Sequence, residues 1–335
     1  MRNLTIRNTL RSHWISRLWI FSILSITAVS IAYAQSTFPN RPIKFIAPFP
    51  PGGTSDVIGR IMAQKLSDAL GQSVIVENRP GASGNIGHDI AAKAAPDGYT
   101  LLLSNSSTVV NNPHLFKQMS FDWYKDFSPI SMVAIAGLVL VVHPSVPVKS
   151  VSELTTLAKS KPGQLNFGSG GKGIQSHISG EMYKTAANVD IVHIPYKGTG
   201  VAVADLVAGQ IHMVFSDMAP AVPFIKANKL RALAVTSPQR STTLPDLPTM
   251  IELGFPNFEA ANWWSIVTSK GVPNNIIERI NQELGKIMTS QEIKDSFEKL
   301  GVTPLYSEPS KVFELSRKES PIVGEILRKA GVEKE

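Results

Sequence analysis

The chain has 335 residues, no cysteine and a formal net charge of +7. The absence of cysteine excludes a disulfide framework, thiol catalysis and thiolate metal sites. Without the four N-terminal arginines Arg2, Arg7, Arg11 and Arg17 the charge falls to +3 (29 basic against 26 acidic residues), so it does not indicate nucleic acid or a membrane surface as a partner.

Residues 1–34 are predicted to be a cleaved export signal. An acid-free, arginine-rich start precedes the apolar run Leu18–Ile31, and Ala32-Tyr33-Ala34 fits the small-x-small cleavage rule. We therefore expect cleavage after Ala34 and a mature protein that begins at Gln35. A membrane anchor is the alternative, but the run has about 14 residues against the roughly 20 needed to span a bilayer.

The first predicted elements of the mature chain are a strand, a rigid turn and the start of a helix. Ile43–Ala47 is apolar and fits a buried strand, and Pro50, Pro51, Gly52 and Gly53 force a turn. The residues that follow, Thr54, Ser55 and Asp56, can cap the helix. Such a turn directs backbone N–H groups and the positive end of a helix dipole at one place, where a small anion can bind.

Strand-like and helix-like segments then alternate along the chain, which is typical of parallel α/β layers. About 300 mature residues exceed the usual size of a single core, so two domains are expected. The predicted strands are Ile43–Ala47, Val74–Glu77, Thr100–Leu103, Leu138–His143, Leu165–Phe167, Ile191–His193, Met213–Phe215 and Arg231–Thr236, and the predicted helices are Val57–Leu70, Val151–Ser160, Ile174–Ala186, Val201–Ala208 and Pro273–Thr289.

A second loop of the same kind, Gly168–His177, also follows a short strand and opens a helix. Two loops that can each bind an anion, far apart in the sequence, suggest a ligand held across a cleft. We expect Gly52, Gly53, Gly168 and Gly170 to matter more for binding than a single cation such as Lys172, because glycine allows close backbone approach. The alternative that each loop is only a tight connection between a strand and a helix stays open.

The second loop also matches Gly-x-Gly-x-x-Gly at Gly168, Gly170 and Gly173, but a dinucleotide site is disfavoured. The acidic residue about 20 positions on is Asp190, which precedes the strand Ile191–His193 and so lies at the wrong end of it. A phosphate-binding P-loop is excluded, because Gly173 follows Lys172 where Ser or Thr is required.

Catalytic and metal-binding patterns are missing from the sequence. It contains no Gly-x-Ser-x-Gly elbow and no His-Glu-x-x-His pair, so we expect no cofactor, no metal and no enzyme activity. An exported hydrolase that pairs Ser169 with His177 is the alternative, although a capping role for His177 is equally compatible with the sequence. A structural or adhesive surface protein is a further alternative, but it would not need two helix-opening glycine loops.

Several long motifs together resemble one family, the tripartite tricarboxylate transporter receptors of the Bug type. The resemblance covers nearly all of the mature chain. The motifs, in order, are Arg41-Pro42-Ile43, Pro48–Asp56, Val76–Gly87, Pro96–Thr100, Leu165–Ser169, Pro195–Gly198, Leu230–Thr236 and Leu244–Met250.

The resemblance implies an α/β fold of the two-lobed periplasmic-binding-protein type (type II, Venus-flytrap), with a ligand cleft between the lobes. Two segments would cross between the lobes, near Val133–Ala136 and Glu259–Trp263. Residues 36–134 plus 260–335 would form lobe 1, and residues 135–259 would form lobe 2.

The resemblance also implies which residues bind the ligand. Those of the first turn are Phe49, Pro50, Gly52, Gly53, Thr54 and Asp56; those of a third loop are Ser104, Asn105 and Ser106; those of the second loop are Gly168, Ser169, Gly170, Gly173, Gln175, Ser176 and His177; and those of the opposite wall are Tyr196, Lys197, Ser216 and Asp217.

The function implied is that of a periplasmic solute-binding protein which captures a small organic carboxylate by closure of the two lobes. Its partners would be the carboxylate and membrane permease subunits of a tripartite tricarboxylate-type transporter, or it would act as a sensor. We expect a monomer and no nucleic acid. The carboxylate itself stays open, from dicarboxylates and tricarboxylates to aromatic acids, amino acids and neutral amides.

Overall fold

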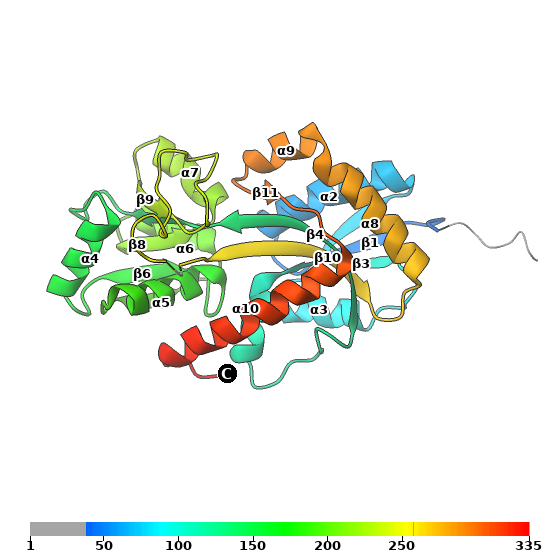
Figure 1. The fold of residues 1–335 in the computed structure, drawn as a ribbon, viewed down its shortest axis with the longest axis horizontal. Helices are drawn as coiled ribbons and strands as arrows, with labels where there is room; N and C mark the ends of the chain where they lie inside the picture. Colours follow the sequence, from blue (N-terminus) through cyan, green and yellow to red (C-terminus); the bar gives the residue numbers. More distant parts are fainter. Residues whose placement is uncertain (1–37, 257, 335) are drawn as a thin grey trace, which may run out of the picture. The chain divides into compact units, whose positions relative to one another are not determined.

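The computed structural model describes residues 38–256 and 258–334 (Figure 1). The predicted export signal and its cleavage after Ala34 lie outside the described residues. Residues 42–335 form one compact unit, and the fold below is that of this unit. Within the described ranges, no helix has the length and apolarity that a membrane crossing requires.

The first of two sheets has six strands in the order β11-β4-β10-β3-β1-β2. Strand β1 pairs in parallel with β2 and β3, whereas β10 runs antiparallel to both β3 and β4. The bounds of these strands are β1 Ile43–Ala47, β2 Val74–Asn78, β3 Thr100–Asn105, β4 Phe127–Gly137, β10 Ala261–Ser269 and β11 Thr303–Pro304.

The second sheet has five strands in the order β7-β6-β8-β5-β9. Strand β6 is parallel to β7 and β8, and β5 is antiparallel to β8 and β9. The bounds are β5 Val139–Val142, β6 Asn166–Ser169, β7 Val192–Pro195, β8 Met213–Ser216 and β9 Arg231–Val235.

Helices cover both sheets. Helices α2, α3, α8 and α10 pack on strands of the first sheet, and α5, α6 and α7 pack on strands of the second. Figure 1 shows α10 running from the first sheet to α5, which it contacts. The helix bounds are α2 Thr54–Leu70, α3 Asn85–Ala92, α4 Val151–Ser160, α5 Gln175–Ala187, α6 Thr199–Val207, α7 Met218–Lys226, α8 Asn274–Thr289, α9 Gln291–Glu298 and α10 Pro309–Lys329, and the short helices are η1 Ala82–Gly84, η2 Ser107–Asn111 and η3 Asn112–His114.

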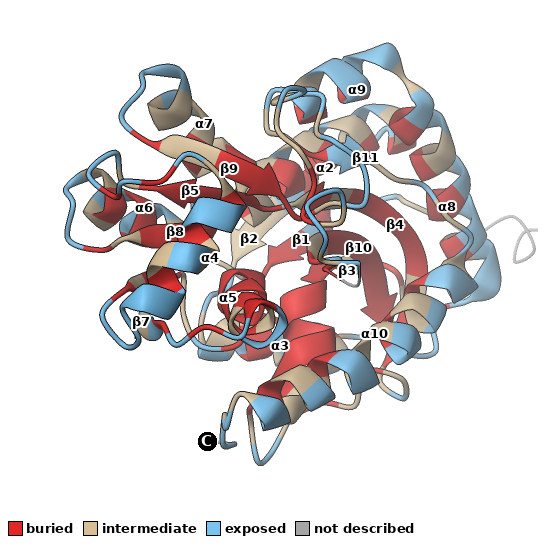
Figure 2. Cartoon of the chain, turned by 60° about the vertical axis from the view of Figure 1, so that its left-hand side comes forward, coloured by how far each residue is buried: buried red, intermediate tan, exposed pale blue. Residues whose placement is uncertain are grey.

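Strand β5 shows why the strands read as continuous apolar runs. Side chains alternate between the two faces of a strand, and here both faces are covered. Leu140 and Val142 belong to a core cluster with Phe167 and Phe215, while Val139 and Val141 belong to a separate cluster with residues of α6 and α7. Figure 2 shows the result, with buried strands inside and exposed residues on the outer faces of the helices.

The α/β fold class with two sheets is confirmed, and all eight predicted strands are present with small shifts at their ends. The expectation of parallel layers was wrong in part, because both sheets are mixed and the sequence reading missed β4 and β10. The proposed lobe boundaries fall inside β4 and just before β10. The division into lobes at these residues stays a prediction.

Candidate ligand-binding loops

The turn Phe49–Asp56 connects β1 to α2 and is held from within. Gly52 has φ +86°, a conformation that favours glycine, and its N–H donates to Asp56 Oδ2 at 3.0 Å. The same carboxylate accepts from Arg60 Nε at 3.0 Å, and its other oxygen accepts from Asn78 Nδ2 at 2.8 Å. Asp56 is buried, and both oxygens of its carboxylate accept hydrogen bonds that stabilise the turn.

The charge of Asp56 is stabilised by these contacts. Burial alone would raise the pKa of Asp56, but hydrogen bonds from Arg60, Gly52 and Asn78 outweigh it and hold the pKa below its usual value.

The structure shows no backbone or packing reason for glycine at the predicted position Gly53. Its φ of −82° is ordinary, and a Cβ there would meet only Pro50 O, at 3.9 Å.

Of the predicted third loop, Ser104–Ser106, only Ser106 follows β3, because the strand extends to Asn105. The side chain of Ser104 points inward. Ser104 is fully buried, and its Oγ lies 2.9 Å from His88 Nε2. The other ring nitrogen, Nδ1, lies 2.9 Å from Gly84 O. Because a carbonyl only accepts, Nδ1 carries the hydrogen and Ser104 donates to Nε2.

His88 is therefore a neutral buried histidine, and it holds Ser104 in place by accepting its hydrogen bond. Burial lowers its pKa to about 4, and its ring stacks on Phe121 with 5.2 Å between centroids. Sequence reasoning missed His88. Asn105 is structural too, since its side-chain oxygen accepts the N–H of Thr108 at 3.1 Å.

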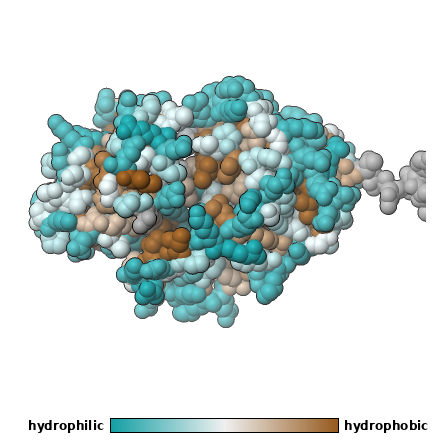
Figure 3. Space-filling model, viewed as in Figure 1, coloured by the Kyte–Doolittle hydropathy of each residue, from teal (hydrophilic) through white to brown (hydrophobic). Residues whose placement is uncertain are grey.

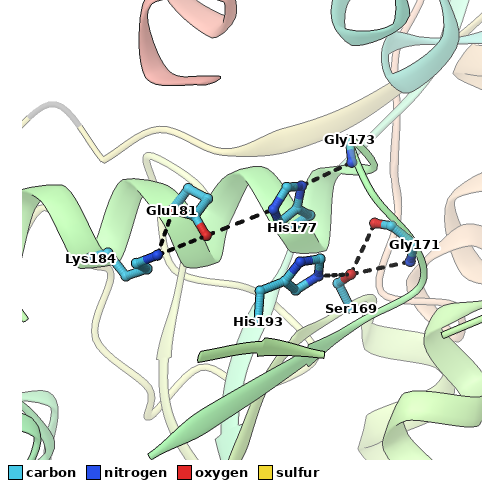
Figure 4. Close-up of polar contacts among 7 residues, drawn as sticks. All are labelled: Ser169, Gly171, Gly173, His177, Glu181, Lys184 and His193. Atoms are coloured by element: carbon cyan, nitrogen blue, oxygen red, sulfur yellow. Dashed lines mark hydrogen bonds and ion pairs between the residues drawn. The ribbon is translucent and has the colours of Figure 1, made fainter. Parts of the chain in front are cut away.

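The second loop, Gly168–His177, is held by its own side chains (Figure 4). The N–H of Gly170 donates to Ser176 Oγ at 3.1 Å, that of Gly171 to Ser169 Oγ at 3.2 Å, and that of Gly173 to His177 Nδ1 at 2.9 Å. The amides of Gly170 and Gly173 fix the loop against the start of α5, where Gln175 and Ser176 are buried, and that of Gly171 closes a turn within the loop.

A pair of stacked histidines lies behind this loop. The rings of His177 and His193 are 3.9 Å apart between centroids, and His193 Nε2 lies 2.6 Å from Ser169 Oγ. Burial lowers the pKa of His177 to about 3, and the neighbouring charges of His193, Lys184 and Lys172 add to the effect. Burial likewise lowers the pKa of His193 to about 4. Both rings are therefore neutral near pH 7.

Glu181 completes the cluster in Figure 4. Its Oε1 lies 3.7 Å from His177 Nε2, and its Oε2 lies 3.0 Å from Lys184 Nζ. Burial raises the pKa of Glu181, against the lowering effect of Lys184.

This geometry does not support the hydrolase alternative. Ser169 is fully buried and is paired with His193, while the acceptor nitrogen of His177 is taken by Gly173 N–H. A nucleophile needs an exposed hydroxyl in contact with its base. Ser169 instead donates to Gly171 O at 2.9 Å, so its role is to shape the loop.

Glycine is required in the second loop for close packing. A Cβ at Gly168 would lie 2.5 Å from Ile211 Cδ1, and one at Gly170 would lie 2.6 Å from Thr199 N. The predicted wall residue Tyr196 packs its ring beside Gly168, and its hydroxyl donates to Asp205. Burial and Asp205 raise the pKa of Tyr196 to about 12. Lys197 is exposed.

The second loop touches residues that follow β3. Asn111 Nδ2 donates to Gly173 O at 2.6 Å, and Asn111 is fully buried. Gly173 has φ +75°, and a Cβ there would lie only 1.7 Å from Leu115 Cδ1. The loop and the segment after β3 therefore fit closely against each other, a contact that sequence reasoning missed.

Of the last two predicted residues, Ser216 ends β8 and Asp217 follows it as the N-cap residue of α7. Ser216 is buried and donates to Asp217 O at 2.8 Å. Asp217 Oδ1 accepts from Asn262 Nδ2 at 3.2 Å, and Asn262 Oδ1 faces Ser106 Oγ and Ser107 Oγ, both at 3.3 Å. Asn262 thus connects the end of β8 to the end of β3. The sequence analysis did not predict a site role for Asn262, although the predicted crossing segment Glu259–Trp263 contains it.

A hollow elsewhere on the protein contains none of the predicted binding residues. It has a volume of about 470 Å³ and lies beside β9, where Arg231, Leu244 and Leu247 help to line it. It lies at the β9 edge of the second sheet, whereas β6, which leads into the second loop, lies near the opposite edge. We therefore do not assign the ligand to it. In the view of Figure 3, most of the visible face is hydrophilic and its hydrophobic patches are small and separated.

Comparison with known proteins gives consistent matches along the chain. The family model described as "Tripartite tricarboxylate transporter family receptor" matches residues 58–332. Protein BugT of Bordetella pertussis is 38% identical over 313 residues, which cover 93% of this chain and 94% of BugT.

Two solved structures are similar over most of the chain. "R. palustris Rpa4515 with adipate" has a TM-score of 0.84 and 31% identity, and the match covers 89% of this chain and 100% of that one. "Structure of periplasmic binding protein BugD" has a TM-score of 0.80 and 32% identity, with the same coverage of 89% and 100%.

Proposed function

This chain belongs to the tripartite tricarboxylate transporter receptor family, Bug type, and we propose that it captures one small organic carboxylate between the turn Phe49–Asp56 and the loop Gly168–His177. Members of this family are solute-binding proteins, and that is the role of this chain. The position of the site, the chemistry of its ligand and its partners are what we add.

The observation that carries the proposal is the matched geometry of the two loops. Each follows the carboxyl end of a parallel strand, β1 or β6, and each opens a helix, α2 or α5. The first N–H groups of a helix have no partner within the helix, and the helix dipole adds positive charge at the same end. The two helix starts belong to different sheets, and a carboxylate held between them would receive donors from both.

The donors we assign are the first-turn amides of Thr54 and Ser55 in α2 and of Gln175 and Ser176 in α5. The amides of Gly52, Gly170 and Gly173 already donate hydrogen bonds within the protein. No bond of the ligand is made or broken in this proposal. The wider assignments belong to the same proposal: cleavage after Ala34, a monomer in the periplasm, and delivery of the ligand to membrane permease subunits or to a sensor.

A ligand screen tests the function. Freshly purified mature protein is examined by native mass spectrometry for a co-purified small molecule, and its thermal unfolding is followed with a panel of organic acids. A bound acid at about 100 times its dissociation constant adds about 2.7 kcal/mol to the free energy of unfolding. If no acid raises the melting temperature and no small molecule co-purifies, the proposal is wrong.

A matched pair of variants then tests the place of the site. Gly52 and Gly71 have φ of +86° and +69°, and at both positions a Cβ would meet nothing within 4 Å. Gly52 precedes α2 and Gly71 follows it. Gly52→Ala and Gly71→Ala should therefore cost similar stability, about 1 kcal/mol each from backbone strain.

Only Gly52→Ala should weaken binding of the acid found in the screen, by tenfold or more, because relief of the strain moves the start of α2. Lys172→Ala should weaken it less than threefold. Equal affinities for Gly52→Ala and Gly71→Ala would place the site elsewhere.

A further inference from the structure

Asp217 occupies an unusual position for an acidic residue. It lies between β8 and α7 as the N-cap residue of α7, and it is half-buried. Its carboxylate accepts from Asn262 Nδ2 at 3.2 Å and from the Thr199 hydroxyl. Both donors are neutral.

These two donors place Asp217 beside the second loop and the end of β3. Thr199 lies against the second loop, since its N and Oγ1 are 2.6 and 2.8 Å from the position of a Cβ at Gly170. Asn262 reaches Ser106 and Ser107 at the end of β3. Two residues further along β10, Trp264 Nε1 donates to Ser55 Oγ in the first turn of α2 at 2.8 Å. A ligand held between the two helix starts would therefore lie near the carboxylate of Asp217.

The charge of Asp217 has no cation beside it in the part of the chain that the structure describes. Among the ion pairs of residues 38–256 and 258–334, none includes Asp217. Burial raises the pKa of Asp217, while the hydrogen bonds from Asn262 and Thr199 lower it less. A half-buried carboxylate with only neutral donors is stabilised by a further donor or cation and destabilised by another anion.

We propose that the ligand is a carboxylate whose far end carries a hydrogen-bond donor, such as an ammonium, a primary amide or a hydroxyl group, and that Asp217 selects this donor and disfavours a second carboxylate. This inference rests on the proposed function, because it takes the first carboxylate to be held by the helix starts. Specificity then arises by repulsion of the wrong ligand as well as by attraction of the right one.

Matched ligands of equal length test the selection. Calorimetric titration of the mature protein compares succinate, glutarate and adipate with their half-amides and with the ω-amino acids of the same chain lengths. At the length that fits, the half-amide or the amino acid should bind at least tenfold more tightly than the dicarboxylate.

The variant Asp217→Asn removes the charge and keeps the size of the side chain and an oxygen that can accept from Asn262. It should weaken the amino acid at least tenfold and strengthen the dicarboxylate, so that the preference falls or reverses. Asp246→Asn is the matched control, because Asp246 is an exposed acid on the outer side of the second sheet. It changes the net charge equally and should leave both affinities unchanged.

The outcomes separate this inference from the proposed function. A wild-type protein that binds the dicarboxylate as tightly as its half-amide and amino acid at every length overturns the role of Asp217 and leaves carboxylate capture intact. That comparison needs no variant, so it stands even if Asp217→Asn fails to fold. A protein that binds no acid of any kind overturns the proposed function and this inference with it.

Discussion

Replacing Gly173 by Ala should be among the most damaging single-methyl changes in the protein. The residue has φ +75°, and adoption of this conformation by alanine costs about 1–2 kcal/mol. The new Cβ would lie 1.7 Å from Leu115 Cδ1 and 3.0 Å from its Cγ, so the leucine or the loop must move. Overpacking of this kind costs about 1–3 kcal/mol. The expected loss is therefore about 2–5 kcal/mol.

A double-mutant cycle separates the two contributions. Leu115 is 5% exposed, so Leu115→Ala alone should cost about 2–5 kcal/mol. In the double variant the alanine at position 173 has room, because the leucine side chain is gone. The stability losses of the two single variants should therefore add up to about 1–3 kcal/mol more than the loss measured for the double variant. Gly71→Ala supplies the control for backbone strain without overlap.

Urea denaturation of the four proteins, followed by tryptophan fluorescence and circular dichroism, gives the free energies of unfolding. If Gly173→Ala costs no more than Gly71→Ala, or if the cycle shows no coupling, the close fit between the second loop and the segment after β3 is refuted.

Three further predictions concern pH and processing. Folded His88 has a pKa of about 4 against about 6.5 when unfolded. The unfolded chain therefore binds the extra proton, and acidification from about pH 6.5 to 4 should remove about 3 kcal/mol of stability; an unchanged pH dependence in His88→Gln would contradict this. The pKa of Asp56 is lowered by folding, so its stabilisation is present above its unfolded pKa and is lost as the pH falls through the folded one. Asp56→Asn should cost about 1–3 kcal/mol at pH 7 and much less at pH 2, and equal costs in urea denaturation at both would contradict it. N-terminal sequencing of the periplasmic fraction should begin at Gln35, and an uncleaved chain in the inner membrane would contradict the signal.

Local apolar patterning was enough to locate most strands but not the two longest. Ile43–Ala47 was predicted with the observed bounds because an apolar run between turn residues has few alternatives. Strand β4 contains Pro129 and Ser131, which argue against a central strand. Strand β10 begins with Ala261 and Asn262, and its apolar and polar residues alternate poorly. Both strands are specified by long-range pairing: they pair with each other, β10 also pairs with β3, and β4 also pairs with β11. A local window of sequence does not contain these partners.

The candidate site also has parts that local sequence predicts and parts that long-range contacts determine. The strand, turn and helix start at each loop follow from apolar, proline and glycine residues that are neighbours in sequence. The predicted capping of α2 by Thr54, Ser55 or Asp56 was wrong, because Gly53 is the N-cap residue and no side chain of the described residues caps this helix start. The direction of each side chain does not follow from sequence neighbours. Ser104 turns inward because His88, 16 residues away, accepts its hydrogen bond, and Asp56 turns inward because Asn78 and Arg60 reach it. The part played by Asn262 depends on Asp217, which is 45 residues away.

The hydrogen bonds within the loops also change which groups hold the ligand. A carboxylate bound by the amides of Gly52, Gly170, Gly171 and Gly173 would have to replace bonds that the protein already makes to Asp56, Ser176, Ser169 and His177. Each such bond contributes about 0.5–1.5 kcal/mol, and a buried acceptor left without a partner costs more.

Binding through the first-turn amides of α2 and α5 breaks none of these bonds, because those amides have no carbonyl partner within the helix. The glycine-rich segments are then rigid supports that fix two helix starts, and affinity comes from donors that are already in place before the ligand arrives. Since such donors attract any carboxylate equally, discrimination between acids must come from residues beyond the loops, and Asp217 with its partner Asn262 lies where that choice can be made.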